Sequence, residues 1–415
     1  MTTLMPSQRP TRRSRLGTAG ALLAVAAVSA GAQRPSGDTI PRIDIYGFGQ
    51  ADMIFDFKRN DPNWFDVNRP SKLPAHDLDF NANGNFYGSA RQSRLGAKGT
   101  LPTGNGDVFA QFEFDMFGVG PDAGQTTIRL RHAYGQWKQI GAGQTNSQFM
   151  DVDVFPNILD YWGPNGMLFF RNVQVYWRPI DRDGGRTQLT LALERPGASG
   201  DGGQFADRVQ LQNVQPRFPW PDLTGGYKGG GKWGYVKITG IVGDIHYEQI
   251  PTDTFDLSGH VIRWGTSLSS NINISRDVLR LQATYGDGIQ NYFNDAPVDV
   301  GPKFNLANRR TPLEGKALPI FGTSLYLDHT WSSAFTSAIG WSMVNISNSD
   351  AQTADAYHNG QYASANLLWT PVKNLMMGGE FQYARRTNFA DDFHFDDYRL
   401  QFSFKYSFSK HLGGQ

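Results

Sequence analysis

The chain has 415 residues, no cysteine, 47 glycines, and 10 Trp, 16 Tyr and 28 Phe. The lack of cysteine excludes a disulfide scaffold and any thiolate metal site, and the aromatic content is too high for a disordered chain. A formal net charge of +1 excludes a strongly basic nucleic-acid binder. No apolar run reaches the roughly 18 residues that a membrane-spanning helix needs.

The first 32 residues have the three parts of a secretory signal peptide. Four arginines between positions 9 and 15 precede an apolar stretch at 16–28, and Ala-Gly-Ala at 30–32 offers a cleavage site. This segment holds four of the 39 basic residues and no acid, so its removal leaves a net charge of −3 with neutral His. We therefore predict export and cleavage, with residues 33–42 as a short periplasmic segment.

The rest of the chain has a hydrophobic period of two. Between 398 and 408 every even position is apolar and every odd position is polar. Segments 108–116, 188–194 and 279–285 repeat this alternation. A strand has such a pattern when its two faces meet different solvents.

Sixteen strands account for the alternating segments. In chain order we expect them at about 43–57, 86–100, 107–117, 127–138, 140–147, 167–178, 187–195, 221–228, 232–249, 259–270, 277–290, 318–331, 335–347, 359–370, 374–387 and 396–408. Short turns join them at 101–106, 178–186, 228–232, 271–276, 332–335 and 371–374. Long irregular loops lie between, at 58–85, 148–166, 196–220 and 291–317.

Short turns at one end and long loops at the other predict an all-β fold, a 16-stranded antiparallel transmembrane β-barrel at 43–408 with a C-terminal tail at 409–415. Lipid offers no hydrogen-bond partner to an unpaired backbone group, so the first strand should pair with the last. Sixteen strands are wide enough for an aqueous lumen. A water-soluble sandwich or propeller is disfavoured, because its outward face would be polar and no blade repeat of about 40–50 residues is present.

Seven stretches carry a resemblance to a known family. They are 43–50, 60–67, 90–96, 127–135, 143–156, 161–166 and 170–175. These runs resemble the DcaP-like trimeric outer-membrane porins, and the similarity extends over 43–408. The resemblance implies an outer-membrane homotrimer that admits small anions, dicarboxylates and aromatic acids in particular. The chain departs from some members in having no heptads for a coiled coil at 33–42, and from many outer-membrane proteins in continuing past Phe408.

Strand parity assigns basic side chains to the lumen, where a basic ring favours anions. The candidates are Arg94, Lys98, Arg129, Arg131, Arg171, Lys237, Arg263 and Arg280. Two points are irregular: parity places His132 on the lipid face, and Arg171 shares the parity of apolar neighbours, so a bulge within 169–171 is needed to turn it inward. The plainer interpretation is that any charged strand residue must avoid lipid, since exposure there costs about 2–4 kcal/mol. Acids at Asp52, Glu113, Asp115 and Glu380 fit that interpretation.

The loop at 148–166 is the expected constriction. It carries Asp151, Asp153 and Asp160 together with Phe149, Phe155, Tyr161 and Trp162. By resemblance to general porins it folds into the barrel opposite the basic wall. Carboxylates facing arginines across water would create a transverse field that orients a charged solute. The plainer alternative is that the aromatic side chains narrow the pore by packing alone.

No cofactor or metal site is predicted, because the eight histidines are scattered, no nucleophile motif is present, and the Gly226–Lys232 run lacks the Ser or Thr of a phosphate loop. An acidic loop at 391–397 leaves divalent-ion binding open. The expected partners are small anionic solutes, outer-membrane lipid and lipopolysaccharide, and two further copies of the chain, with no nucleic acid. Two alternatives to a channel remain: a non-conducting structural or adhesive barrel, and an outer-membrane lipolytic enzyme, which would need a serine beside His132 or His329 on the lipid face.

Overall fold

The computed structural model describes residues 40–80, 82–250 and 255–413. These described residues belong to one compact unit. The predicted signal peptide at 1–32, and residues 33–39 of the predicted periplasmic segment, lie outside the described residues.

Twenty strands are found in the described part of the chain. They are β1 (Arg42–Asp56), β2 (Asn85–Ser89), β3 (Arg94–Leu101), β4 (Val108–Phe117), β5 (Thr126–Trp137), β6 (Ile140–Asn146), β7 (Arg171–Arg182), β8 (Thr187–Glu194), β9 (Val214–Arg217), β10 (Asp222–Gly231), β11 (Gly234–Gln249), β12 (Gly259–Ile274), β13 (Asp277–Asp287), β14 (Val300–Phe304), β15 (Leu313–Ala317), β16 (Pro319–Thr330), β17 (Phe335–Ile346), β18 (Tyr357–Val372), β19 (Leu375–Asn388) and β20 (His394–Leu412).

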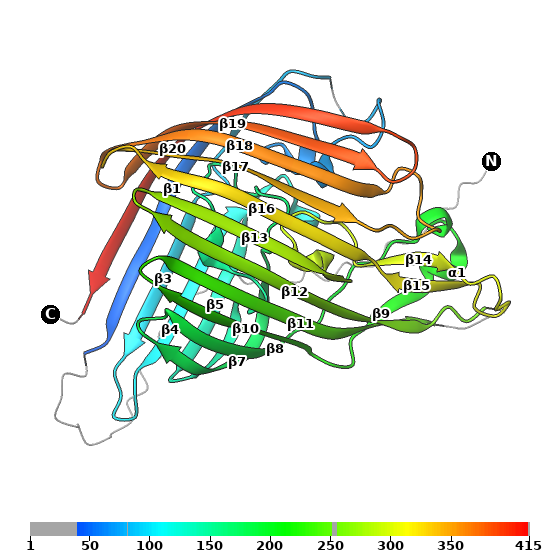
Figure 1. Ribbon diagram of the computed structural model, residues 1–415, viewed down its shortest axis with the longest axis horizontal. Helices are drawn as coiled ribbons and strands as arrows, with labels where there is room; N and C mark the ends of the chain where they lie inside the picture. The colour runs from blue at the N-terminus through cyan, green and yellow to red at the C-terminus, as the bar shows by residue number, and fades with distance from the viewer. Residues whose placement is uncertain (1–39, 81, 251–254, 414–415) are drawn as a thin grey trace, which may run out of the picture. The chain divides into compact units, whose positions relative to one another are not determined.

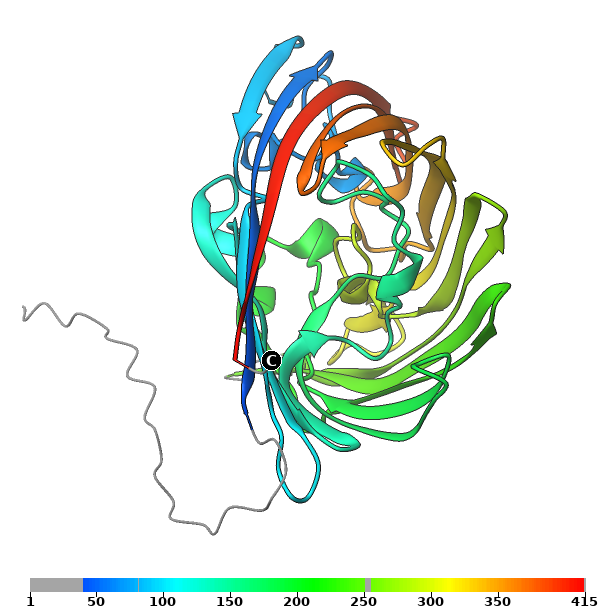
Figure 2. The ribbon, with the colours of Figure 1, turned by 90° about the vertical axis from the view of Figure 1, so that its left-hand side faces the viewer.

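Eighteen of these strands form one antiparallel sheet that closes into a barrel with sixteen strand positions. Two positions are each occupied by two short strands in succession: β2 and β3 both pair with β1, and β9 and β10 both pair with β11. The seam joins β1 to β20 over a continuous ladder from Ile43↔Leu412 to Asp56↔Arg399. Figure 1 shows the two strands side by side, and Figure 2 shows the ring that they complete. Closure leaves the sheet without a lipid-exposed edge.

The predicted 16-stranded barrel is therefore confirmed, with differences at a few boundaries. β20 continues to Leu412, so most of the tail expected at 409–415 is strand. Polar residues Ser409, Lys410 and His411 end the alternation, although their backbone still pairs with β1. The short strand β9 and the β14–β15 hairpin lie inside stretches that the sequence predicts as loops.

The connections differ in length at the two ends of the barrel (Figure 1). Short turns join β3 to β4, β5 to β6, β7 to β8 and the later hairpins, and long segments join the strands at the other end. The long segments contain one short helix and six 3-10 turns within the described residues. These are α1 (Val209–Gln212), η1 (Pro62–Trp64), η2 (Pro70–Lys72), η3 (Gly120–Asp122), η4 (Val152–Val154), η5 (Gly203–Phe205) and η6 (Gln290–Tyr292).

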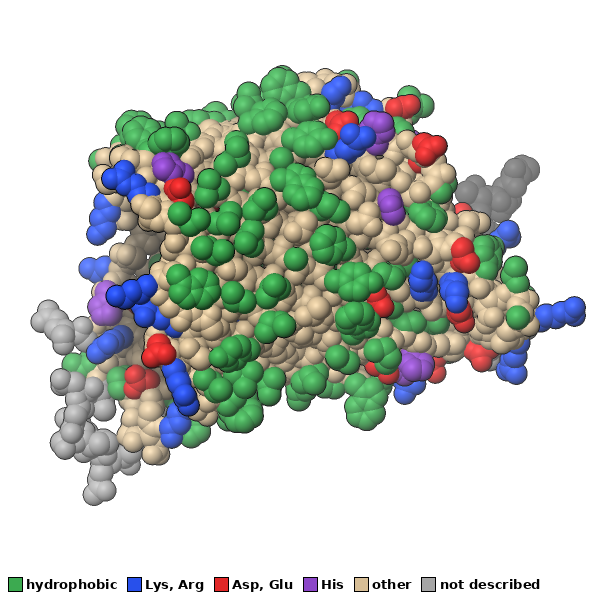
Figure 3. Space-filling model, viewed as in Figure 1, with side chains coloured by type: hydrophobic (Ala, Val, Ile, Leu, Met, Phe, Trp, Pro, Cys, Tyr) green, Lys and Arg blue, Asp and Glu red, His purple; other side chains and the backbone are tan. Residues whose placement is uncertain are grey.

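The outer face of the barrel is apolar and the inner face is polar. On β20, Phe402 is 49% exposed whereas Gln401 and Ser403 are buried inside. Figure 3 shows apolar side chains over the strands and charged side chains gathered toward the two ends. This inverts the arrangement of a water-soluble protein and suits strands that face lipid.

Among the described residues, no helix is both long enough and apolar enough to span a membrane.

Candidate channel constriction

The loop between β6 and β7, residues 147–170, runs inside the barrel. At its start, the hydroxyl of Ser147 and the backbone N–H of Gln148 both donate to Glu194 of β8, at 2.8 and 2.9 Å. Next, Thr239 of β11 donates to the carbonyl of Phe149 at 2.7 Å. The loop backbone is buried, so polar side chains on the inner wall satisfy its hydrogen bonds.

Apolar side chains of the same loop fix its path. Phe149, Met150 and Leu168 belong to a buried cluster with Ile241 of β11 and Ile320 of β16. Such burial contributes about 1.5–3 kcal/mol for each large side chain. The sequence places these residues next to polar ones, so the loop can pack on the wall while its polar groups are bonded.

The loop then reaches the opposite wall. Glu380 of β19 accepts hydrogen bonds from the backbone N–H groups of Leu159 and Asp160, at 2.7 and 3.0 Å. Gln92 and Gln401 donate to the carbonyl of Leu159, at 3.1 and 3.3 Å. The segment expected to fold into the barrel is thus held from several sides of the lumen.

A cluster of four arginines, Arg94, Arg129, Arg131 and Arg171, lies beside this loop; we call it the arginine cluster. Arg129 pairs with Asp115 at 2.7 Å, and Arg131 pairs with both Asp115 and Glu113, at 2.8 and 2.6 Å. The hydroxyl of Tyr161, on the loop, bonds to Arg129, Arg131 and Asp115 together. Tyr161 also stacks on Phe117 with centroids 4.6 Å apart. The constriction loop therefore rests directly on a basic wall.

Two members of the arginine cluster each have a buried Nε that no hydrogen bond satisfies within the described residues. Arg94 lies 3.6 Å from Glu113, with its side chain 23% exposed, and its Nε has no hydrogen-bond partner among the described residues. Arg171 lies over the Phe169 ring at 4.4 Å, and its Nε is likewise unpartnered within the described part. Its charge interacts with those of Arg94 and Arg131. Four guanidinium groups face two carboxylates here, which leaves a positive excess.

Lys405 extends the arginine cluster, although it was not among the predicted residues. Its ammonium lies 4.0 Å from the ring centroid of Phe48, and Arg94 lies 5.2 Å from the same ring. The alternation of 398–408 already assigns Lys405 to the polar face. Its role depends on Phe48 and Arg94, which come from strands far away in sequence.

A β-bulge in β5 removes the irregular position of His132. The β4–β5 ladder shifts register so that Glu113 pairs with His132 and Phe114 with Leu130, which leaves Arg131 as the extra residue. Parity therefore reverses after Arg131. His132 faces inward and bonds to Thr145 at 3.1 Å. The predicted lipid-face position of His132 was wrong for this reason.

The bulge expected within 169–171 is absent. The β6–β7 ladder runs from Asn146↔Arg171 to Ile140↔Trp177 without a shift of register. Arg171 is instead the first residue of β7, directly after the loop. Its position at the strand end, rather than a bulge, allows its side chain to approach the cluster.

The three loop acids do not face a water-filled gap as a group, which corrects the expected arrangement. Asp151 is buried and accepts from Tyr235 and Ser269, at 2.7 and 2.6 Å. Asp160 is also buried, where it accepts from the backbone N–H groups of Asn68 and Trp162. Asp153 alone of the three has an exposed side chain, 53%, and it pairs with Lys228 at 2.6 Å.

The remaining predicted basic residues divide into lining and structural positions. Lys237 donates to the Met150 carbonyl at 2.8 Å, and Arg280 donates to the Asp153 carbonyl at 2.7 Å, so both hold the loop. Lys98 lies 5.8 Å from the Tyr46 ring centroid on the inner wall. Arg263 is 1% exposed, and its guanidinium pairs with Asp222 and donates to the Gly197 carbonyl. Arg263 therefore cannot contact a passing solute.

A cavity of about 240 Å³ opens on the short-turn side of the loop. Its polar lining includes Arg178, Lys228 and Lys237, with Asp151 and Asp153 on the loop side. Short turns face the periplasm in barrels of this kind. Basic side chains therefore continue from the constriction toward the periplasmic end.

Comparison with known proteins identifies the family. The DcaP outer membrane protein family matches residues 16–408. The chain belongs to this family. Its members are channels of the bacterial outer membrane and not enzymes. A search of curated proteins found no match.

Solved structures share the fold of this DcaP-family chain. The outer membrane channel DcaP of Acinetobacter baumannii is 21% identical with a TM-score of 0.73, covering 88% of this chain and 97% of its own. An anion-selective porin from Comamonas acidovorans is 9% identical with a TM-score of 0.57, over 89% and 100%. The trimer form of Vibrio cholerae OmpT is 10% identical with a TM-score of 0.52, over 89% and 99%.

Proposed function

We propose that this channel admits small anions, with dicarboxylates and aromatic acids as the preferred class. The observation that carries the proposal is the arginine cluster beside the constriction loop, where four guanidinium groups face two carboxylates. A basic constriction lowers the barrier for anions and raises it for cations. The Arg94 side chain is 23% exposed, so its guanidinium can meet a passing carboxylate, and guanidinium groups bind carboxylates well.

The side chains that line the lumen beyond the constriction also favour anions. Arg178, Lys228 and Lys237 line the cavity on the periplasmic side. Conduction requires binding that is strong enough to attract and weak enough to release. Half-exposed or partnered cations meet this requirement better than a closed pocket, because water competes for them.

The assembly and surroundings of the channel form part of the proposal. Two structural neighbours carry the descriptions anion-selective porin and trimer form. We infer a homotrimer in which each barrel has its own constriction. The apolar outer band faces lipid, with lipopolysaccharide at the end that carries the long loops. The N-terminal segment 1–32 serves as the export signal.

The decisive test is the zero-current potential of the purified trimer in a planar bilayer under a KCl gradient. A potential of the sign expected for chloride permeation supports the basic constriction. A cation-selective potential would refute anion preference while leaving the channel intact. A barrel that passes no current would instead favour the structural or adhesive alternative.

If chloride selectivity is found, the solute class can be tested in the same bilayer. Dicarboxylates and aromatic carboxylates added to one side should interrupt the chloride current in a concentration-dependent way. Neutral diols of the same size are the matched control. Equal block by both would show that size, and not charge, selects the solute.

A further inference from the structure

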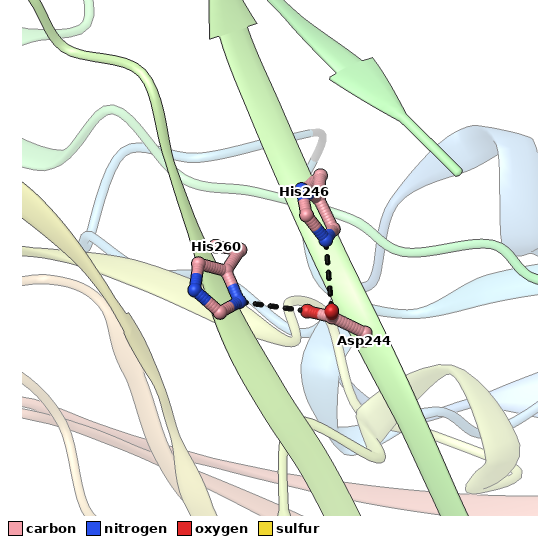
Figure 4. A group of neighbouring side chains, drawn as sticks. All are labelled: Asp244, His246 and His260. Atoms are coloured by element: carbon pink, nitrogen blue, oxygen red, sulfur yellow. Dashed lines mark hydrogen bonds and ion pairs between the residues drawn. The ribbon is translucent and has the colours of Figure 1, made fainter. Parts of the chain in front are cut away.

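Two histidines and an aspartate meet on the outer face of β11 and β12. His246 and His260 are directly paired across the two strands, and their rings stack with centroids 4.9 Å apart. Asp244 lies two residues before His246 on the same face. Its Oδ2 is 2.8 Å from His246 Nε2, and its Oδ1 is 3.0 Å from His260 Nδ1. Figure 4 shows all three side chains pointing toward one another.

The position of this group is outside the lumen and beyond the lipid-facing band. Its alternation with buried Ile245 places Asp244 and His246 on the exterior. Val242 of β11 and Ile262 of β12, exposed by 54% and 52%, are the next residues on that face. The group thus lies at the end of the apolar band that is nearer to the long loops. The His260 side chain is 58% exposed, so an ion can reach it from water.

The donor set matches the preferences of a transition metal. One ligand atom from each residue can be chosen so that all three lie within 4.8 Å of one another. Two imidazole nitrogens and one carboxylate oxygen are typical ligands of Zn²⁺ and its neighbours in the first row. Hard cations such as Ca²⁺ prefer a shell made of oxygen. The group is therefore unlike an acidic loop that holds calcium.

The neighbouring charges permit a cation. Arg217 of β9 pairs with His246 in the strand register, but its guanidinium lies 3.9 Å from Glu248. That carboxylate offsets the nearest positive charge. Asp244 supplies the negative charge that an incoming metal ion requires.

We propose that Asp244, His246 and His260 bind a divalent first-row transition metal ion of the Zn²⁺ type at the outer rim of the barrel. The ion replaces the two histidine–aspartate hydrogen bonds with coordinate bonds and keeps an open position for water. It also joins β11 to β12 where both extend beyond the membrane band. Metal binding therefore stabilises the extended hairpin as well as occupying the site.

The site can be tested by titrating Zn²⁺ into the purified, chelator-treated protein in detergent, without a histidine tag. Isothermal titration calorimetry of the natural sequence should show one ion bound per chain. His246→Gln and His260→Gln should each weaken binding by about a hundredfold or more, since loss of even an outer-shell partner costs ten- to a hundredfold. Co²⁺ should give visible absorption bands that both substitutions abolish.

A matched control comes from the described chain itself. His329 bonds to Asp277 on a neighbouring strand. Within the described residues this pair has no third metal-ligating side chain beside it. His329→Gln should bind Zn²⁺ as the natural sequence does. Absence of stoichiometric Zn²⁺ binding would overturn the proposal. Unchanged binding in His246→Gln and His260→Gln would overturn it equally, and the heat-dependent migration of each variant in gels will show that the barrels are folded.

Discussion

At the scale of residues, Arg94 and Arg171 differ from the other arginines of the constriction in how they are bonded. Arg129 and Arg131 are saturated by Asp115, Glu113 and Tyr161, so they hold the loop in place. Arg94 and Arg171 are held less firmly: Arg94 lies 3.6 Å from Glu113, and Arg171 has no ion pair among the described residues. The same residue type therefore holds the loop in one pair and is less firmly bonded in the other.

This division predicts the effect of neutral substitutions. Arg94→Gln combined with Arg171→Gln should lower the chloride-over-potassium permeability ratio by about half, because two of four cations leave the constriction. The zero-current potential in a KCl gradient measures this ratio. Arg276→Gln, on an exposed turn, is the control and should leave the ratio unchanged. An unchanged ratio in the double variant would remove both arginines from the filter.

Asp160 predicts a pH dependence of stability. Burial, with the Glu380 carboxylate as the second cause, raises the pKa of Asp160 to about 7, although Arg399 acts in the other direction. The pKa of an aspartate in the unfolded chain is about 4. Between about pH 4 and pH 7 the folded chain therefore holds more protons than the unfolded chain. Stability therefore falls as the pH rises from about 4 to 7, and the effect is on the order of a few kcal/mol.

The comparison of Asp160→Asn with the natural chain tests this dependence. The variant should lose less melting temperature between pH 5 and pH 8 than the natural sequence does, as followed by circular dichroism. Asp153→Asn alters an exposed aspartate of the same loop and should keep the natural profile. Parallel profiles for all three proteins would show that Asp160 is ionised in the fold throughout this range.

At the scale of elements, the loop at 147–170 is the expected constriction of the channel. It contacts β8, β11, β19 and β20 through the hydrogen bonds of Ser147, Phe149 and Leu159. Deleting 151–160 removes its far half. The single-channel conductance should then rise about twofold or more, since conduction depends on the narrowest cross-section. Deleting 305–311, at the tip of the β14–β15 hairpin, should leave conductance unaltered; equal effects would place the constriction elsewhere.

The alternation of side chains predicts strands well and short irregular elements poorly. All sixteen strand positions of the barrel were predicted, because contact with lipid on one face imposes a hydrophobic period of two on each of them. β9, β14 and β15 have four or five residues, too few for a period to emerge. Parity also fails wherever a bulge inserts a residue, as at Arg131.

The inward path of the loop was predictable, but its detailed contacts were not. The basic wall follows from parity, and the path of the loop follows from the resemblance to general porins. The burial of Asp151 and Asp160 depends on partners far along the chain, such as Ser269 and Glu380, at separations of 118 and 220 residues. A single sequence contains no local signal for such contacts. The outer His246–His260 pair depends on the register between β11 and β12, which the alternation alone does not fix.

At the scale of the whole molecule, the apolar band predicts which substitutions prevent assembly. Leu191 of β8 is 41% exposed on the outer face, whereas Gln188 of the same strand lines the inner cavity. Leu191→Arg should cost about 2–4 kcal/mol if it lies near mid-bilayer, while Gln188→Arg meets water and Asp181. The yield of heat-modifiable barrels in outer membranes measures the difference. Similar yields for the two variants would contradict the assignment of the two faces.

The loop at 147–170 is bonded to Glu380 on one wall of the barrel and to Thr239 on the other, so it connects the two walls. The pore lies between this loop and the barrel wall. A bilayer that changes the cross-section of the barrel should therefore also shift the arginine cluster relative to this loop. We expect permeation to depend on how far the surrounding bilayer deforms the barrel across the loop.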